Sequence, residues 1–261
     1  HMVMFRGADG AIYQPADYWI TDEEKTGDCG ATALYRSRDE GDSWKEVTRI
    51  DHQIENLAKD GQTAGAIAGP HGVAVDLKDG SLLGIGRRAT IDGNLIFSRS
   101  KDGGASWTYS RSPFPKIKFC QRPSMLRLKE GPILFIAYTS ELTQPGHSKI
   151  APVPSEAGDV ELAVNYQGWT FLDANDQEYT GYGLYAAVSY DEGETWPVRK
   201  LITPGGAAKR MFGAGHHHFF KMDETHAEPG GYTYTTQSPD GVIHLINSCL
   251  HYRFNLKWIE T

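Results

Sequence analysis

The sequence predicts an all-β fold of four-stranded antiparallel blades, the architecture of a β-propeller. Three observations support this prediction. One eight-residue turn pattern occurs three times, a second kind of tight turn recurs between these copies, and 29 Gly residues stand among aromatic residues and short polar turns. No long apolar run at helical spacing competes with the strands. We therefore expect about four propeller blades in this sequence.

The eight-residue pattern is Ser-x-Asp-x-Gly-x-Ser/Thr-Trp, and each copy follows a short strand-like run. The copies lie at residues 37–44, 100–107 and 189–196. Within a copy, the Asp carboxylate and the Ser hydroxyl suit backbone N–H groups, the Gly suits a positive φ, and the Trp can fold back onto its blade. Each octet is therefore predicted to be a hairpin turn that joins two strands of a blade.

A second hairpin signal, an acidic residue followed by Gly, divides two more strands in each repeat. It occurs at residues 8–10, 78–80, 129–131 and 239–241. The repeating unit is then strand, tight turn, strand, loop, strand, octet, strand. The predicted blades cover residues 3–50, 71–113, 122–204 and 232–261. The last blade has no octet and is incomplete, and its third strand is expected at residues 253–259.

The second and third octets lie further apart than the first two, which predicts an insertion. Residues 142–182 are the expected insertion because they contain several Pro and Gly residues. We expect residues 1–261 to form a single propeller domain. Since no strand precedes the first blade to complete the last one, either N-terminal blades or a second chain in a homo-oligomer would complete the ring. A four-bladed ring is the alternative.

The charge balance argues against a nucleic-acid partner. The sequence has 26 Lys and Arg against 33 Asp and Glu, and a formal net charge of −7, whereas phosphate binding needs a basic surface. No apolar stretch of about 18 residues predicts a membrane span. No signal peptide is visible, and His1 and Met2 resemble a cloning remnant, so the native N-terminus is expected to lie upstream.

The sequence predicts neither a metal site nor a cofactor site. Cys29, Cys120 and Cys249 lie far apart, without the close spacing of a zinc site. Residues 216–218 are all His, but adjacent side chains of an extended segment alternate between its two sides. The Gly pair at residues 205–206 lacks the Lys-Ser/Thr of a phosphate-binding loop.

Strand order predicts which polar residues share one face of the propeller. Residues at the starts of first strands and the ends of second strands should lie together at the mouth of the central channel. The candidate site residues at or beside these positions are His71, Arg87, Arg122, His226, Glu228, Tyr232, His251 and Arg253, accompanied by Tyr18, Trp19, Arg88, Tyr138 and Glu141. Several Arg side chains suit a carboxylate, and Tyr or His beside a carboxylate suits a nucleophile or a general acid and base. The alternative is that the Arg residues form structural ion pairs between blades.

The octets, together with residues 67–71, 82–87, 121–123, 126–132, 237–244 and 251–256, resemble bacterial sialidase-like propellers with BNR repeats, in which the octet is called an Asp box. The resemblance implies a sialidase-like exo-glycosidase that acts on a terminal acidic sugar of a glycan or polysaccharide. It further implies a secreted or periplasmic location.

The resemblance also implies roles for the candidate site residues. Arg87, Arg122 and Arg253 would hold the sugar carboxylate, and Tyr232 and Glu228 would form the nucleophile pair. From their places at the strand ends, His226 is expected to bind substrate, and His71 and His251 are expected to complete the catalytic set.

Two other functions stay open. Related propellers cleave uronate or rhamnose linkages as lyases or hydrolases that rely on a His and sometimes a Tyr. His71 suits that role, because an Arg that neutralises a uronate carboxylate would acidify the adjacent C–H. Asp boxes also occur in non-catalytic carbohydrate-binding propellers. The composition of the site favours an enzyme over a binding protein.

Overall fold

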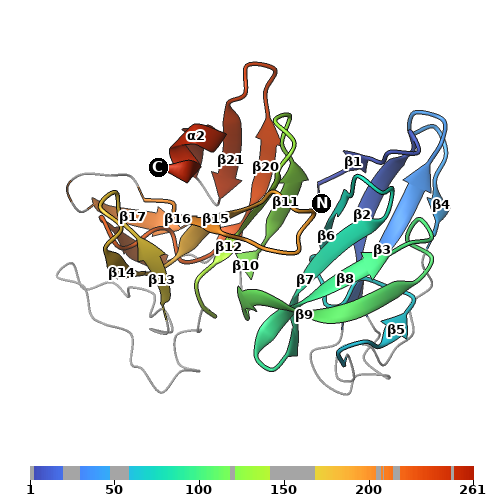
Figure 1. The fold of residues 1–261 in the computed structure, drawn as a ribbon, viewed down its shortest axis with the longest axis horizontal. Coiled ribbons are helices and arrows are strands. Elements are labelled where there is room, and N and C mark those ends of the chain that lie inside the picture. The colour runs from blue at the N-terminus through green and yellow to red at the C-terminus, as the bar shows by residue number, and fades with distance from the viewer. Residues whose placement is uncertain are drawn as a thin grey trace. The chain divides into compact units, whose positions relative to one another are not determined.

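The computed structural model describes residues 3–19, 30–47, 59–117, 121–141, 168–203, 207, 209–213, 218–247 and 250–261. Nearly all of the elements in these segments are β-strands (Figure 1). Antiparallel sheets of three to five strands follow one another along the chain, as the blades of a β-propeller do. The predicted fold class is therefore confirmed.

Two compact units divide the chain. The first comprises His1–Lys116 with Met125–Arg127 and Asp191–Gly193, and the second comprises Ile117–Ser124, Leu128–Tyr190 and Glu194–Thr261. The grouping of residues 1–261 into one propeller domain stays a prediction.

The first blade is a four-stranded sheet in sequential order. Its strands are β1 (Phe5–Arg6), β2 (Ile12–Trp19), β3 (Gly30–Ser37) and β4 (Lys45–Glu46). Tyr13 of β2 and Leu34 of β3 are buried in a core cluster that also contains Ile67, Trp107 and Tyr109 of the next blade. Burial of these large side chains is the main force that holds the first unit together.

The second blade has five strands in the order β5-β9-β8-β7-β6. They are β5 (Thr63–Ala64), β6 (Val73–Asp76), β7 (Leu82–Ile91), β8 (Asn94–Ser100) and β9 (Trp107–Pro115). The pairing of β7 with β8 shifts register between Ile85 and Thr90, so the chain bulges there. A bulge of this kind changes the direction of the side chains that it carries, and here it carries Arg87 and Arg88.

The octet turns have the predicted chemistry in the first two blades. Ser43 N donates to Asp39 Oδ1 at 2.9 Å, and Gly41 N donates to Ser37 Oγ at 2.9 Å. The second octet repeats both bonds, from Ser106 N to Asp102 Oδ1 at 2.9 Å and from Gly104 N to Ser100 Oγ at 2.8 Å. The first Gly takes φ 97° and the second takes φ 95°.

The tryptophans of the three octets differ in burial. Trp107 is fully buried and Trp196 is 6% exposed, whereas Trp44 is 41% exposed. In the first two octets the indole Nε1–H donates to the octet Gly carbonyl at 3.0 Å, so the turn itself orients the ring. The amount of apolar surface that the ring buries is set by the packing around it.

The third blade is a four-stranded sheet in the order β11-β12-β15-β16. Its strands are β11 (Ser124–Arg127), β12 (Ile133–Tyr138), β15 (Leu184–Ser189) and β16 (Val198–Leu201). Every residue of β12 and β15 is buried. Of the predicted insertion, residues 142–167 lie outside the described residues. The rest contains an antiparallel hairpin of β13 (Trp169–Leu172) and β14 (Glu178–Gly181).

The fourth blade has three strands in the structure, β20 (Tyr234–Gln237), β21 (Ile243–Asn247) and β22 (Leu250–Phe254). The prediction of a third strand at residues 253–259 is wrong. The third strand begins at Leu250 and ends at Phe254, and helix α2 (Leu256–Glu260) follows it. Asn255 starts the helix by accepting the Trp258 N–H on its side chain at 2.9 Å.

Two further strand pairs complete the second unit. Strands β17 (Lys209–Gly213) and β18 (His218–Met222) form an antiparallel hairpin. Strands β10 (Gln121–Arg122) and β19 (Gly231–Tyr232) pair in parallel, which aligns Arg122 with Tyr232.

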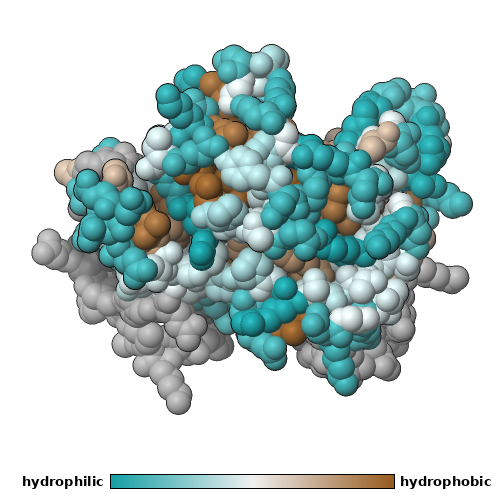
Figure 2. Space-filling view, viewed as in Figure 1, coloured by the Kyte–Doolittle hydropathy of each residue, from teal (hydrophilic) through white to brown (hydrophobic). Residues whose placement is uncertain are grey.

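The drawn face of the molecule is mostly hydrophilic, with small hydrophobic spots (Figure 2). Among the described residues, no helix is both long and apolar enough to cross a membrane.

Candidate functional site

The first unit pairs His71 with Asp17. His71 precedes β6 and Asp17 lies on β2 of the neighbouring blade. The ring Nδ1 of His71 contacts Asp17 Oδ2, and the backbone N–H of His71 donates to Asp17 Oδ1. The two side chains are 8% and 22% exposed. One carboxylate therefore fixes both the ring and the backbone of His71.

Thr32 of β3 holds the loop that carries His71. Its hydroxyl donates to Gly69 O at 2.9 Å and accepts the N–H of Gly72 at 2.7 Å, so it contacts the chain on both sides of His71. A Cβ on Gly72 would lie 2.6 Å from Thr32 Oγ1, which explains why Gly stands there. Held in this way, His71 adopts φ 55°, a left-handed conformation that is uncommon for a residue other than Gly.

Arg87 contributes positive charge to the same cluster. It lies in the bulge of β7 and is 3% exposed, and its backbone N–H donates to Pro70 O at 2.9 Å. Burial of Asp17 raises its pKa, but the hydrogen bonds from His71 and the charges of His71 and Arg87 outweigh this effect, so the pKa of Asp17 lies below its ordinary value. Asp17 is therefore a carboxylate near neutral pH.

This arrangement suits proton transfer by His71. With Nδ1 directed to Asp17, Nε2 is the ring nitrogen that would exchange a proton with a substrate. A buried Arg beside it suits a carboxylate or a developing oxyanion. The cluster of Asp17, His71 and Arg87, here called the His71 cluster, therefore contains a base, the carboxylate that orients it and a cation.

The second unit contains a cluster around Glu228, which is fully buried. The Tyr252 hydroxyl donates to Glu228 Oε2 at 3.4 Å. This distance is long for a bond between two oxygen atoms. Tyr138 is also fully buried; its hydroxyl donates to Gly231 O at 2.5 Å and lies 3.1 Å from Asn247 Oδ1. We refer to Glu228, Tyr252, Tyr138 and Arg122 as the Glu228 cluster.

The negative charge of Glu228 acts on its neighbours. The pKa of Tyr138 is held well above its ordinary value, first by burial and then by the negative charge of Glu228, while the positive charge of Arg122 acts in the opposite direction. Tyr138 is therefore a neutral hydrogen-bond donor near neutral pH. The cluster combines a buried carboxylate, two tyrosines and an Arg.

Arg122 and Tyr232 form a cation–π contact. The Arg122 guanidinium lies 4.9 Å from the centroid of the Tyr232 ring, and Arg122 Nη2 donates to Thr233 O at 3.5 Å. Tyr232 is 45% exposed whereas Glu228 is fully buried, so the two members of the predicted nucleophile pair have different surroundings. The structure instead brings the Tyr252 hydroxyl to Glu228. The assignment of Tyr232 as nucleophile stays a prediction.

His251 and Arg253 flank Tyr252 on β22, and all three alternate along the strand. Both flanking residues are exposed, whereas Tyr252 is partly buried. His251 Nε2 lies 3.1 Å from His244 Nδ1, and the two rings stack at 5.3 Å. Arg253 faces His244 across the strand pair. The structure thus directs these two predicted residues to the side of β22 opposite Tyr252.

His226 has a separate set of contacts. Its ring stacks on Tyr182 with a centroid distance of 5.0 Å, and Nδ1 lies 2.8 Å from Asp223 Oδ1. Burial of Asp223 raises its pKa, but hydrogen bonds from Lys221 and His226 outweigh it, so the pKa of Asp223 lies below its ordinary value. The substrate-binding role of His226 stays a prediction.

Asp17 and Tyr252 are the residues that the sequence analysis missed. Tyr252 had a signal, since it stands between two predicted site residues, and a change of one position in a strand reverses the direction of the side chain. Asp17 had no such signal in the sequence, because its partner His71 lies in another blade. The cysteines at 29, 120 and 249, His216 and His217, and the side chains of Tyr18, Trp19 and His218 lie outside the described residues.

No protein-family model and no curated protein matches this sequence. Among solved structures, a protein of unknown function from Dyadobacter fermentans is similar with a TM-score of 0.50 and 13% identity, over 97% of this chain and 50% of that one. An intramolecular trans-sialidase from Ruminococcus gnavus has a TM-score of 0.49 and 14% identity, and the match covers 99% of this chain and 44% of that one. An α-L-arabinofuranosidase from Fusarium graminearum has a TM-score of 0.37 and 10% identity, and the match covers 99% of this chain and 93% of that one. This chain therefore spans about half of the first structure, and that likeness concerns the fold.

Proposed function

We propose that this protein is a carbohydrate-active enzyme that hydrolyses the bond to a terminal acidic sugar. The observation that carries the proposal is the contact between the Tyr252 hydroxyl and the buried Glu228 carboxylate. A tyrosine is a weak nucleophile unless a base removes its proton, and a buried carboxylate within hydrogen-bond reach is such a base. A tyrosine nucleophile is the known exception among glycosidases, which otherwise use two carboxylates.

The proposed reaction has two steps. In the first, Tyr252 Oη forms a bond to the anomeric carbon, Glu228 accepts the phenol proton, and the bond to the leaving oxygen breaks as that oxygen takes a proton from water. In the second, water attacks the same carbon and releases a proton to solvent, the bond to Tyr252 Oη breaks, and Glu228 returns its proton to that oxygen. Arg122 supplies a cation for the sugar carboxylate.

The test is turnover of fluorogenic sialosides and glucuronides by the intact protein. We expect release of the fluorophore from at least one acidic glycoside, and loss of release in Tyr252→Phe. The matched control is Tyr234→Phe, because Tyr234 lies in the same unit and is 43% exposed. Absence of turnover with the whole panel, or full activity of Tyr252→Phe, would contradict the proposal. Binding without turnover would instead favour a non-catalytic carbohydrate-binding propeller.

The His71 cluster supports a second candidate, a polysaccharide lyase that acts at a uronic acid. His71 would take the proton beside the uronate carboxylate, and Arg87 would stabilise the resulting enolate. The bond to the neighbouring sugar oxygen would then break by β-elimination as that oxygen takes a proton from water. The product is an unsaturated uronate that absorbs ultraviolet light.

The lyase candidate has its own matched pair of variants. We expect Arg87→Gln to abolish the ultraviolet signal, and Arg111→Gln to retain it, because Arg111 is an exposed residue of the same unit that donates to Asn94 Oδ1 at 3.4 Å. If uronic-acid polymers give no unsaturated product, this candidate is wrong.

A further inference from the structure

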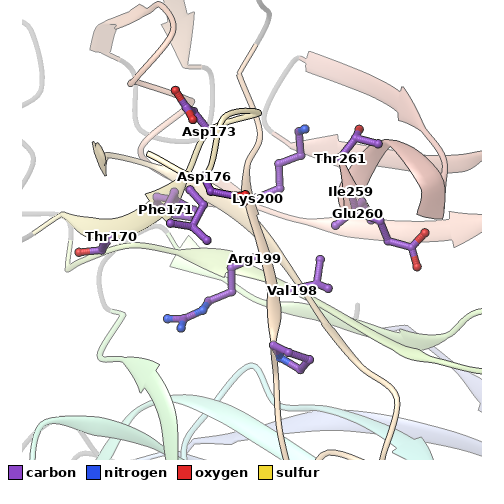
Figure 3. A pocket seen from close by; sticks show the side chains of 12 residues that line it. Thr170, Phe171, Asp173, Asp176, Val198, Arg199, Lys200, Ile259, Glu260 and Thr261 are labelled. Atoms are coloured by element: carbon purple, nitrogen blue, oxygen red, sulfur yellow. The ribbon is translucent and has the colours of Figure 1, made fainter. Parts of the chain in front are cut away.

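A cavity of about 230 Å³ lies in the second unit, outside the Glu228 cluster. The residues that define its chemistry are Phe171, Asp173, Asp176, Lys200, Ile259 and Glu260 (Figure 3). None of the residues that line it belongs to the Glu228 cluster. The cavity is large enough for a small ligand and is formed by three elements, the hairpin β13–β14, the blade strand β16 and helix α2.

Two of these elements are additions to the four-stranded blade. The hairpin is inserted between β12 and β15, and α2 follows the last strand of the fourth blade. Helix α2 is anchored here by Ile259, which is 2% exposed, and by a hydrogen bond from the Tyr190 hydroxyl to Glu260 Oε1. The blade sheet needs neither addition for its own hydrogen bonding, yet together they build the cavity beside β16.

Lys200 is the donor that is available to a ligand. Within the described part of the chain its ammonium contacts the Trp258 ring, 4.6 Å from the centroid, and no carboxylate. Burial lowers the pKa of Lys200 below its ordinary value, so a ligand oxygen that accepts its hydrogen bonds would replace lost hydration. Arg199 points the other way (Figure 3) and its guanidinium lies 4.4 Å from the Trp169 ring centroid.

The cavity is also lined by carboxylates, which can accept hydrogen bonds from a ligand, and by an apolar surface. Asp173 Oδ1 is engaged by the N–H groups of Asn175 and Gln177 at 2.8 and 2.9 Å, and Glu260 is engaged by Tyr190. Asp176, in the same turn with φ 58°, adds a further carboxylate. Phe171 is 2% exposed and, with Ile259, forms an apolar surface.

This combination fits a neutral sugar. Sugar hydroxyls both donate to carboxylates and accept from an ammonium, and the C–H face of the ring packs on apolar side chains. An anionic ligand fits less well, because three carboxylates and two cations line the cavity. We propose that the cavity is a second carbohydrate site, which binds a neutral sugar unit through Lys200 and Asp176.

The test is saturation-transfer NMR of the full chain with the methyl glycosides of glucose, galactose and mannose, and with glucuronic acid as the anionic comparison. We expect binding of at least one methyl glycoside. Lys200→Met keeps the hydrocarbon stem over Trp258 and removes the charge, and should weaken binding about tenfold or more. Lys129→Met, an exposed site in the same unit, should leave binding unchanged.

Asp176→Asn is the second variant, because Asn tolerates the left-handed conformation of this position. It should also weaken binding, and circular dichroism checks that both variants are folded. Binding of no methyl glycoside, binding that neither variant changes, or binding of glucuronic acid alone would overturn the proposal. The outcome is separate from the proposed hydrolysis, since an inactive protein that binds a methyl glycoside through Lys200 would contradict only the proposed reaction.

Discussion

The His71 cluster and the Glu228 cluster hold a carboxylate in opposite ways. Burial raises the pKa of Asp17, but the hydrogen bonds from His71 and the positive charge of Arg87 hold it below the ordinary value. Glu228 is fully buried beside tyrosines, and its negative charge helps to raise the pKa of Tyr138. A carboxylate with a low pKa orients a neighbouring base, whereas a buried carboxylate beside a phenol can take its proton. The two units therefore suit two different reactions.

The largest expected effect is on activity, and it separates the two clusters. If the protein is the proposed glycosidase, Tyr252→Phe should lower kcat by roughly 10² to 10⁴-fold, while His71→Gln should do so if it is the lyase. Steady-state kinetics of both variants with the active substrate measures this. Equal and small losses in both variants would show that neither cluster contains the catalytic group.

The next largest effect is on the stability of the first unit. Asp17→Asn removes the charged partner of His71, and we expect it to lower the free energy of unfolding by about 1 to 3 kcal/mol. Urea denaturation followed by fluorescence measures the change. A variant as stable as the wild-type protein would mean that the Asp17–His71 pair does not support the fold.

Thr32 provides a smaller and sharper test of the same cluster. Thr32→Val removes the hydroxyl that contacts Gly69 and Gly72 but keeps the shape of the side chain. It should lower the free energy of unfolding by about 1 kcal/mol. Thr32→Ser keeps the hydroxyl and should lose less. If the two variants are equally stable, the hydroxyl does not hold the His71 loop.

The pH dependence has the smallest expected effect. Because the pKa of Asp17 in the folded protein lies below its ordinary value of 3.8, its contribution to stability is present above that value and is lost as the pH falls through the folded pKa. The stability difference between wild type and Asp17→Asn should therefore shrink below about pH 4. A difference that grows on acidification would contradict the ion pair.

Local chemistry explains why the fold was predictable. The octet residues form hydrogen bonds with one another, from Gly41 N to Ser37 Oγ and from Ser43 N to Asp39 Oδ1, so the turn can be predicted without the rest of the chain. Helix α2 was missed because residues 253–259 continue an apolar and polar alternation. Asn255 was its one sequence signal, as a helix N-cap.

The site was less predictable because it depends on pairing between blades and on strand phase. His71 and Arg87 were found from their places at a strand start and a strand end, and the structure brings them to the same carboxylate. That carboxylate, Asp17, lies on a strand of another blade. Tyr252 was missed although both of its neighbours were predicted as site residues, since the predicted strand began at residue 253 and the observed strand begins at Leu250.

The most direct test of the central claim is the covalent step at Tyr252. The protein would be incubated with acidic glycosyl fluorides that carry a second fluorine beside the anomeric carbon, which slows the second step, and then digested for mass spectrometry. The proposed hydrolysis predicts a glycosyl adduct on the peptide that contains Tyr252, and its loss in Tyr252→Phe. An adduct on another residue, or formation of an unsaturated uronate with no adduct, would contradict it.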